Sequence, residues 1–193
     1  TGAQTWACWV KLDTAGTYSF FNHNGGSPNK SLQILVVSGG KFRLQVSENG
    51  TGSVNLDSTT TPTTGTWYHV AGVFNPALSS LARRIYVNGT LENNASPIYS
   101  SLNDTSVDIG IGANSAGDFK LDGNMADCRI YDADIGDSAI ADLAAGTDYQ
   151  TNLVGWWLTD SDDLDDYASV PHDATEGSGS SSTYSTDGPL DLS

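Results

Sequence analysis

The sequence predicts an all-β fold, either a sandwich or a barrel, with one short helix. Three observations support this class. Short segments of alternating apolar residues recur along the 193 residues, turn-forming Gly, Asn, Asp and Ser separate them, and 38% of the residues are hydrophobic against 16% charged. Short strands joined by polar turns are typical of sandwiches and barrels. Because this length suits one domain, we expect a single domain over residues 1–193.

The strands are predicted from alternation, because successive side chains of a strand point to opposite faces of its sheet. They cover residues 6–12, 17–23, 31–37, 41–47, 66–74, 83–88, 106–112 and 125–132. Gly39-Gly40 predicts a two-residue hairpin between the third and fourth of these strands, and Asn88-Gly89 predicts another after the sixth.

One stretch, residues 137–146, is predicted to form a helix. Asp137 stands where a residue can cap the N-terminus, and Ile140 and Leu143 form the apolar face. We expect this short helix to pack on an edge of the sandwich. A further strand is predicted over residues 152–160, where apolar residues alternate again.

The charge of the chain argues against two classes of partner. The formal net charge is −15 and the pI is about 4.1, which repels the phosphates of nucleic acids and anionic lipid surfaces. No apolar run approaches the roughly 20 residues that span a bilayer, so we expect no membrane insertion. Asn-x-Ser/Thr patterns at Asn49, Asn88 and Asn103 weakly favour an extracellular setting.

Several motifs follow one another in an order that resembles a known family. They include WVK (9–11), WYHVA (67–71), YVNG (86–89) and DCRIY (127–131). This order resembles laminin-G-like domains of the concanavalin A-like lectin/glucanase superfamily, over residues 5–143. The resemblance implies a concanavalin A-like jelly-roll sandwich of two antiparallel sheets. It carries less weight for function than for fold.

Residues 152–193 resemble a segment that precedes the WVK strand in that family, although here they follow the last common strand. Three alternatives remain. The segment completes its own sandwich, as in a circular permutant. It begins a further domain, or it is donated to a neighbouring subunit, because a sandwich edge recruits strands. Donation would make the protein a structural decoration or fibre subunit that self-associates through this segment.

A catalytic site is not expected. The resemblance implies that the glucanases of the superfamily use two Glu around an Asp, whereas Glu48, Glu92 and Glu176 have no acidic partner at strand spacing. Asp127 alternates with apolar neighbours, which predicts a solvent-facing side chain. His69 matches the family's WxHVA position, where we expect a buried structural role. The chain is therefore predicted not to be an enzyme; a glycosidase would need a carboxylate pair in a cleft.

Calcium is the cofactor that the loops favour, because they are rich in carboxylate and amide oxygens. Asn114, Asp118 and Asp122 fall within one loop and are the candidate metal ligands. Ordinary acidic turns are the alternative there. A second acidic run, residues 160–166, lacks the EF-hand spacing, so turns are favoured for it.

The two cysteines are Cys8 and Cys128. The strands that carry them are close neighbours in the resembled fold, which makes a disulfide reasonable. Closing so long a loop would stabilise the fold by roughly 4 to 5 kcal/mol in the chain-entropy model. Two buried free thiols are the alternative.

Ligand recognition is predicted at turns that combine aromatic rings with amides, since sugars bind to such surfaces. The candidate binding residues are Tyr18, Asn22, Asn24, Tyr99 and Asn114. We expect a non-catalytic recognition domain outside a cell, on a cell surface or on a virus particle, with adhesion to a glycan or protein ligand through these loops.

Overall fold

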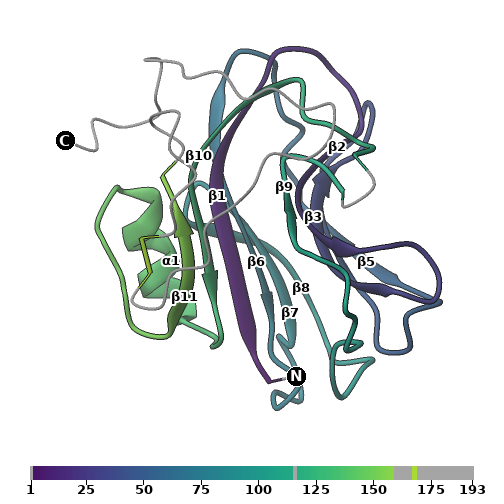
Figure 1. Ribbon diagram of the computed structural model, residues 1–193. Helices are drawn as coiled ribbons and strands as arrows, with labels where there is room; N and C mark the ends of the chain where they lie inside the picture. The colour runs from purple at the N-terminus through teal and green to yellow at the C-terminus, as the bar shows by residue number, and fades with distance from the viewer. Residues whose placement is uncertain (1, 115–116, 159–166, 169–193) are drawn as a thin grey trace.

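The computed structural model describes residues 2–114, 117–158 and 167–168, and these form two antiparallel sheets that lie face to face (Figure 1). The six-stranded sheet contains, in order, β11 (Leu153–Trp157), β10 (Gly123–Tyr131), β1 (Gln4–Leu12), β6 (Trp67–Phe74), β7 (Arg83–Val87) and β8 (Thr90–Ala95). The five-stranded sheet contains β5 (Val54–Asp57), β4 (Phe42–Val46), β3 (Lys30–Val36), β2 (Tyr18–Asn24) and β9 (Gly110–Ile111). The predicted all-β sandwich is confirmed.

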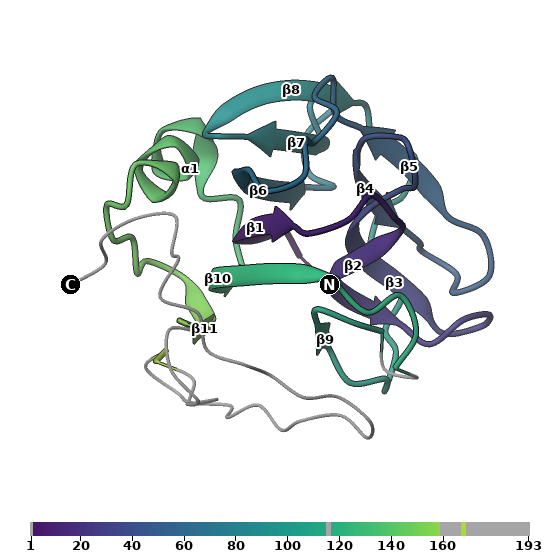
Figure 2. The ribbon, with the colours of Figure 1, turned by 90° about the horizontal axis from the view of Figure 1, so that it is seen from above.

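The hydrophobic core lies between the two sheets, which Figure 2 shows from above. Each strand directs alternate residues inward, so the fully buried Trp6, Phe21 and Phe42 meet there. Gly72 on β6 allows the sheets to approach closely, because a Cβ at this position would stand 3.0 Å from the Cδ1 atoms of Ile34 and Leu44. The register of every strand is therefore constrained by which residues face this core.

Some strand predictions differ from the structure at the sheet edges. The strand predicted over 106–112 is reduced to β9, which pairs only with Phe21 and Asn22 of β2. The short β5 was not predicted, because its four residues are too few for alternation to be recognised.

The hairpin between β3 and β4 has a three-residue loop. Val36 pairs with Phe42, and the Val37 N–H donates to the Lys41 carbonyl oxygen at 3.3 Å, which leaves residues 38–40 in the loop. The predicted two-residue hairpin is wrong by one residue. The difference matters, because a shift of one residue turns every side chain of a strand to the other face.

The hairpin between β7 and β8 has the predicted two-residue loop. Val87 pairs with Thr90, so Asn88 and Gly89 alone form the turn. Their φ angles are 50° and 75°. Positive φ at both central residues suits the right-handed twist of the flanking strands, and Asn-Gly adopts it readily.

The single helix among the described residues, α1 (Gly136–Ala144), covers the outer face of the six-stranded sheet (Figure 1). Its Ile140 and Leu143 pack in one cluster with Tyr86 and Tyr131 of that sheet. The predicted packing on an edge is thus corrected to packing on a face. The predicted cap is wrong as well: Ile135 is the N-cap residue, and Asp137 lies in the first turn.

A bulge in β10 changes the environment of Asp127. The pairing of β1 with β10 shifts register between Ala7 and Trp9, so simple alternation fails there. Asp127 has a φ of 49° and is only 4% exposed. Its Oδ1 accepts hydrogen bonds from Arg129 Nε and Trp156 Nε1, both at 2.7 Å. The prediction of a solvent-facing Asp127 is therefore wrong.

The strand β11 belongs to the same sandwich as the rest of the described chain, because it pairs antiparallel with β10. Beyond it, the Tyr167 N–H donates to the Trp156 carbonyl oxygen at 2.7 Å. Residues 159–166 and 169–193 of this segment lie outside the described residues. Its relation to the family's N-terminal segment, and the alternative of donation to a neighbour, stay predictions.

Candidate functional site

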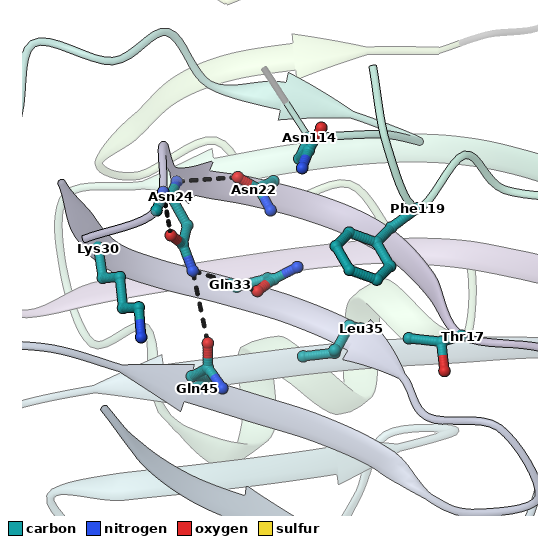
Figure 3. A pocket seen from close by; sticks show the side chains of 10 residues that line it. Thr17, Asn22, Asn24, Lys30, Gln33, Leu35, Gln45, Asn114 and Phe119 are labelled. Atoms are coloured by element: carbon teal, nitrogen blue, oxygen red, sulfur yellow. Dashed lines mark hydrogen bonds between the residues drawn. The ribbon is translucent and has the colours of Figure 1, made fainter. Parts of the chain in front are cut away.

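A pocket of about 340 Å³ opens on the outer face of the five-stranded sheet (Figure 3). The helix α1 lies on the opposite side of the sandwich. The described residues that line the pocket are mainly amides with one cation and one aromatic ring: Thr17, Asn22, Asn24, Gly26, Lys30, Gln33, Leu35, Gln45, Asn114 and Phe119. Its volume falls at the lower end of the range of small-molecule sites.

The register of four neighbouring strands places a row of amide side chains across this face. Asn22 on β2 pairs with Gln33 on β3, Gln33 pairs with Gln45 on β4, and Gln45 pairs with Asn55 on β5. Directly paired residues share a face and stand about 5 Å apart. The neighbouring residues of each strand point into the core, so the row faces outward.

Hydrogen bonds among these amides hold their orientations. Asn24 Nδ2 lies 3.5 Å from the side-chain oxygens of both Gln33 and Gln45 (Figure 3). Gln33 Nε2 donates to Ser19 Oγ at 3.1 Å, and Gln45 Nε2 donates to Asn55 Oδ1 at 2.9 Å. A network of this kind fixes side-chain rotamers before a ligand arrives, which lowers the entropic cost of binding.

The end of β2 is held by side chain to backbone bonds. Asn22 is 2% exposed, and its Oδ1 accepts a hydrogen bond from the Asn24 N–H at 2.8 Å. Asn24 Oδ1 in turn accepts from the Gly26 N–H at 2.9 Å. Short polar side chains that bind the backbone two residues on are characteristic of such turns. The bonds set the direction of the Asn24 amide toward the pocket.

Phe119 forms an aromatic rim at the pocket. Its side chain is exposed, at 53%, and its φ is 53°, a conformation that non-glycine residues rarely adopt. The Phe119 carbonyl oxygen accepts from the Ser19 N–H at 2.9 Å, which ties this loop to β2. Asn114 closes the same loop, since its Oδ1 accepts from the Asp118 N–H at 2.6 Å. Exposed aromatic rings in strained backbone are often functional.

The structure brings together three of the five predicted binding residues, Asn22, Asn24 and Asn114, in this pocket. Tyr18 and Tyr99 do not line it, because both pack against the hydrophobic core. The Tyr18 hydroxyl lies 2.6 Å from Thr14 Oγ1. The aromatic partner of the asparagines is therefore Phe119.

Four residues that line the pocket and are central to its chemistry were not predicted from the sequence. They are Gln33, Gln45, Lys30 and Phe119. Gln33 and Gln45 are polar residues at alternate positions of two strands joined by a hairpin, a pattern that could have indicated a shared outer face. Nothing in the sequence distinguishes Phe119 from a loop residue that packs inward.

Two of the three predicted calcium ligands take part in hydrogen bonds within the described structure. Asn114 Oδ1 is already bonded to the Asp118 N–H, and Asp122 Oδ2 accepts from the Thr14 hydroxyl at 2.6 Å. In the described parts of the chain, no group of three or more His, Cys, Asp or Glu side chains could hold a metal ion. Calcium needs six to eight oxygens, so this set alone does not form a prepared site. Calcium binding stays a prediction.

Both cysteines are free and fully buried in the structure, with 0% exposure. The hydrogen bond that the Cys128 thiol makes with Cys8, together with burial, raises the pKa of the Cys128 thiol well above its ordinary value. The two thiols are thus neighbours across β1 and β10, as the resemblance implied. The disulfide itself stays a prediction.

The sequence model of the concanavalin A-like lectin/glucanases superfamily matches residues 1–141. The chain therefore belongs to this superfamily, as its motifs indicated. A search of curated proteins finds no match. Among the described residues, no helix combines the length and the hydropathy that crossing a membrane would require.

Solved structures with low sequence identity share the fold. A presumed carbohydrate-binding protein of Bacteroides ovatus is 15% identical, with a TM-score of 0.66 over 87% of this chain and 49% of its own. Domain 4 of AbnA, an extracellular arabinanase of Geobacillus stearothermophilus solved with arabinotriose, is 20% identical, with a TM-score of 0.57 over 75% of this chain and 68% of its own.

The ligand-binding domain of botulinum neurotoxin serotype D, solved with N-acetylneuraminic acid, is 15% identical. Its TM-score is 0.53 over 76% of this chain and 37% of its own. The chain spans about half of the Bacteroides protein and less of the neurotoxin domain. At such identities the likeness concerns the fold.

Proposed function

We propose that the chain is a non-catalytic glycan-recognition module that binds sugar in the pocket on its five-stranded sheet. The observation that carries this proposal is the row of amides that line the pocket, Asn22, Gln33 and Gln45, beside the exposed ring of Phe119. Asn22 and Gln33 lie deep in the pocket, at 2% and 6% exposure. Amides donate and accept hydrogen bonds, as sugar hydroxyls do, and an aromatic face packs against the apolar side of a sugar ring.

The composition of the pocket supports binding without catalysis. Hydrolysis of a glycosidic bond uses a pair of carboxyl groups about 5 to 10 Å apart. None of the described residues that line the pocket is Asp or Glu. Structures with the same fold include the arabinanase domain solved with arabinotriose and the neurotoxin domain solved with N-acetylneuraminic acid, which supports a sugar as the ligand class.

We place this module outside a cell, on a cell surface or on a virus particle, where glycans are exposed. The extracellular arabinanase domain supports this setting. Adhesion to a surface glycan is the role that follows.

The test is a glycan array probed with the full chain and with two variants. Phe119→Ala removes the aromatic rim, and we expect it to weaken binding about fivefold to tenfold. Ile98→Ala is the matched control, because Ile98 is exposed at 61% and does not line the pocket. Repeating the array with a chelator tests calcium. An array without signal, or a signal that Phe119→Ala leaves intact, contradicts the proposal.

A further inference from the structure

Lys30 introduces a positive charge into the amide pocket. It is the first residue of β3, and its backbone N–H donates to the Gly50 carbonyl oxygen at 3.1 Å, which fixes its position in the sheet. Lys30 pairs with Asn24 across β2 and β3. In Figure 3, Lys30 and Phe119 lie on opposite sides of Gln33. The pocket therefore has an aromatic end and a cationic end.

The other cations of the chain already have partners. Lys+Arg number 8 against 23 Asp+Glu, so acidic partners are abundant. Arg43 pairs with Asp57, Arg84 with Asp134, and Arg129 with Asp127. Arg83 and Lys41 donate to carbonyl oxygens, Lys11 lies over the ring of Trp67, and Lys120 has a partner too.

Lys30 differs from these seven residues. Within residues 2–114, 117–158 and 167–168, its ammonium forms no ion pair and no hydrogen bond. The described pocket lining also contains no carboxylate, although the chain has a net charge of −15. A cation in a polar pocket whose described lining contains no carboxylate is able to pair with an anionic group of a ligand.

We propose that the pocket selects glycans that carry an acidic group, with Lys30 as the partner of that group. The inference rests on the proposed glycan-binding function and specifies its ligand class. The ammonium of Lys30 binds the carboxylate of a uronic acid or a sulfate ester, since a compact point charge accommodates either anion. Gln33 and Gln45 bind hydroxyls beside the acidic group, and Phe119 packs against a neighbouring ring.

The net charge of the chain makes this selectivity local. A charge of −15 repels an acidic glycan at long range, but this repulsion is screened beyond about 8 Å at physiological ionic strength. Contact with Lys30 acts at much shorter distance, inside the pocket. Lys30 therefore discriminates among glycans that have already reached the five-stranded sheet.

The test compares acidic oligosaccharides with their neutral counterparts on the full chain. The probes are oligogalacturonates, alginate oligosaccharides and chondroitin sulfate oligosaccharides, each beside its carboxyl-reduced or desulfated form. Binding on an array is followed by calorimetry of the strongest pair. We expect the acidic form to bind at least tenfold more tightly, which corresponds to about 1.4 kcal/mol. Comparing uronic acid and sulfate probes distinguishes the two sources of negative charge.

Substitutions separate this inference from the proposed function. Lys30→Gln should reduce the preference for the acidic form to less than threefold, and Lys30→Arg should retain it. Lys41→Gln is the matched control, because it makes the same change in charge immediately before the neighbouring strand β4 and outside the pocket. If Phe119→Ala abolishes binding but acidic and neutral forms bind equally, the inference fails and the proposed function stands. If no oligosaccharide binds, both fail.

Discussion

Gln33 and Gln45 are direct cross-strand partners on the outer face of the five-stranded sheet, and Asn24 Nδ2 lies 3.5 Å from the side-chain oxygen of each. This shared neighbour makes the three amides one unit. A ligand that bonds to either glutamine therefore meets a side chain whose position depends on the other.

The first prediction concerns this unit. Gln33→Ala and Gln45→Ala should each weaken glycan binding about fivefold, because one hydrogen bond contributes roughly 1 kcal/mol. The double variant should lose less than the product of the two effects, since both glutamines share Asn24. Calorimetry with the strongest array ligand measures the cycle. Asn94→Ala, at an exposed position of the other sheet, is the control and should leave binding unchanged. Independent effects would show that the amides act separately.

The second prediction concerns the buried pair of Asp127 and Arg129, whose atoms are 2.7 Å apart. Asp127→Ala removes one ion-pair partner of the buried Arg129 guanidinium and the hydrogen-bond acceptor of Trp156 Nε1. The free energy of unfolding should therefore fall by about 3 to 5 kcal/mol. Asp127→Asn should cost clearly less, because its amide oxygen retains both acceptor roles and Asn tolerates the positive φ. Urea titration followed by tryptophan fluorescence measures both. Equal stability of Asp127→Ala and the parent chain would show that this pair does not anchor β11.

The fold could be predicted from the sequence because both faces of the central strands are constrained. The side chains of WACWVKL in β1 and of WYHVAGVF in β6 point alternately to the two faces of the sheet, and both faces are covered. One face lies on the core, and the other is covered by the helix or by neighbouring residues. The motifs in these strands also occur in the family's order. Asp127 was placed wrongly for a local reason. A bulge in β10 interrupts the alternation on which the prediction rested, and bulges have no sequence signal of comparable strength.

The site was predicted in part, and the missing part depends on register and loop geometry. With the predicted two-residue hairpin, Gln45 would pair with Ile34; the three-residue loop pairs it with Gln33 instead. Lys30 has the same parity as the core residues Leu32 and Ile34, so alternation assigns it to the inner face. Lys30 is the first residue of β3, and from this terminal position its long side chain nevertheless reaches the pocket.

The third prediction is a loss of stability in mild acid. Burial, with a smaller effect of the Arg129 charge, lowers the pKa of His69 from 6.5 to about 3. The unfolded chain binds a proton below pH 6.5 that the folded chain does not bind. This contribution to stability is therefore complete above pH 6.5 and is lost as the pH falls toward 3. Between pH 8 and pH 5 the loss from His69 should be about 2 kcal/mol.

Urea titrations at both pH values measure this loss, and His69→Gln is the comparison, since glutamine does not titrate. Burial lowers the pKa of His23 in the same direction, so the variant should retain a smaller dependence. The hydrogen bond from Arg43 lowers the pKa of Asp57 below 3.8, so that carboxylate contributes to pH dependence only in stronger acid. Identical pH dependence in the variant would show that His69 is not kept neutral by the fold.

The fourth prediction concerns Cys8 and Cys128, which are both fully buried. A thiol reacts as the thiolate, and the raised pKa of Cys128 together with burial suppresses that form. We expect the folded chain, purified under reducing conditions, to react with Ellman's reagent only as fast as it unfolds. In guanidinium, two thiols per chain should react at once. A folded Cys8→Ala variant should release one thiol on unfolding, which calibrates the assay.

Purification without reductant then tests the disulfide between Cys8 and Cys128. The absence of a reactive thiol in guanidinium would show that the disulfide forms, and the oxidised chain should be more stable by roughly 4 to 5 kcal/mol in the chain-entropy model. Fast reaction of the folded, reduced chain would instead mean that β1 and β10 separate locally in solution.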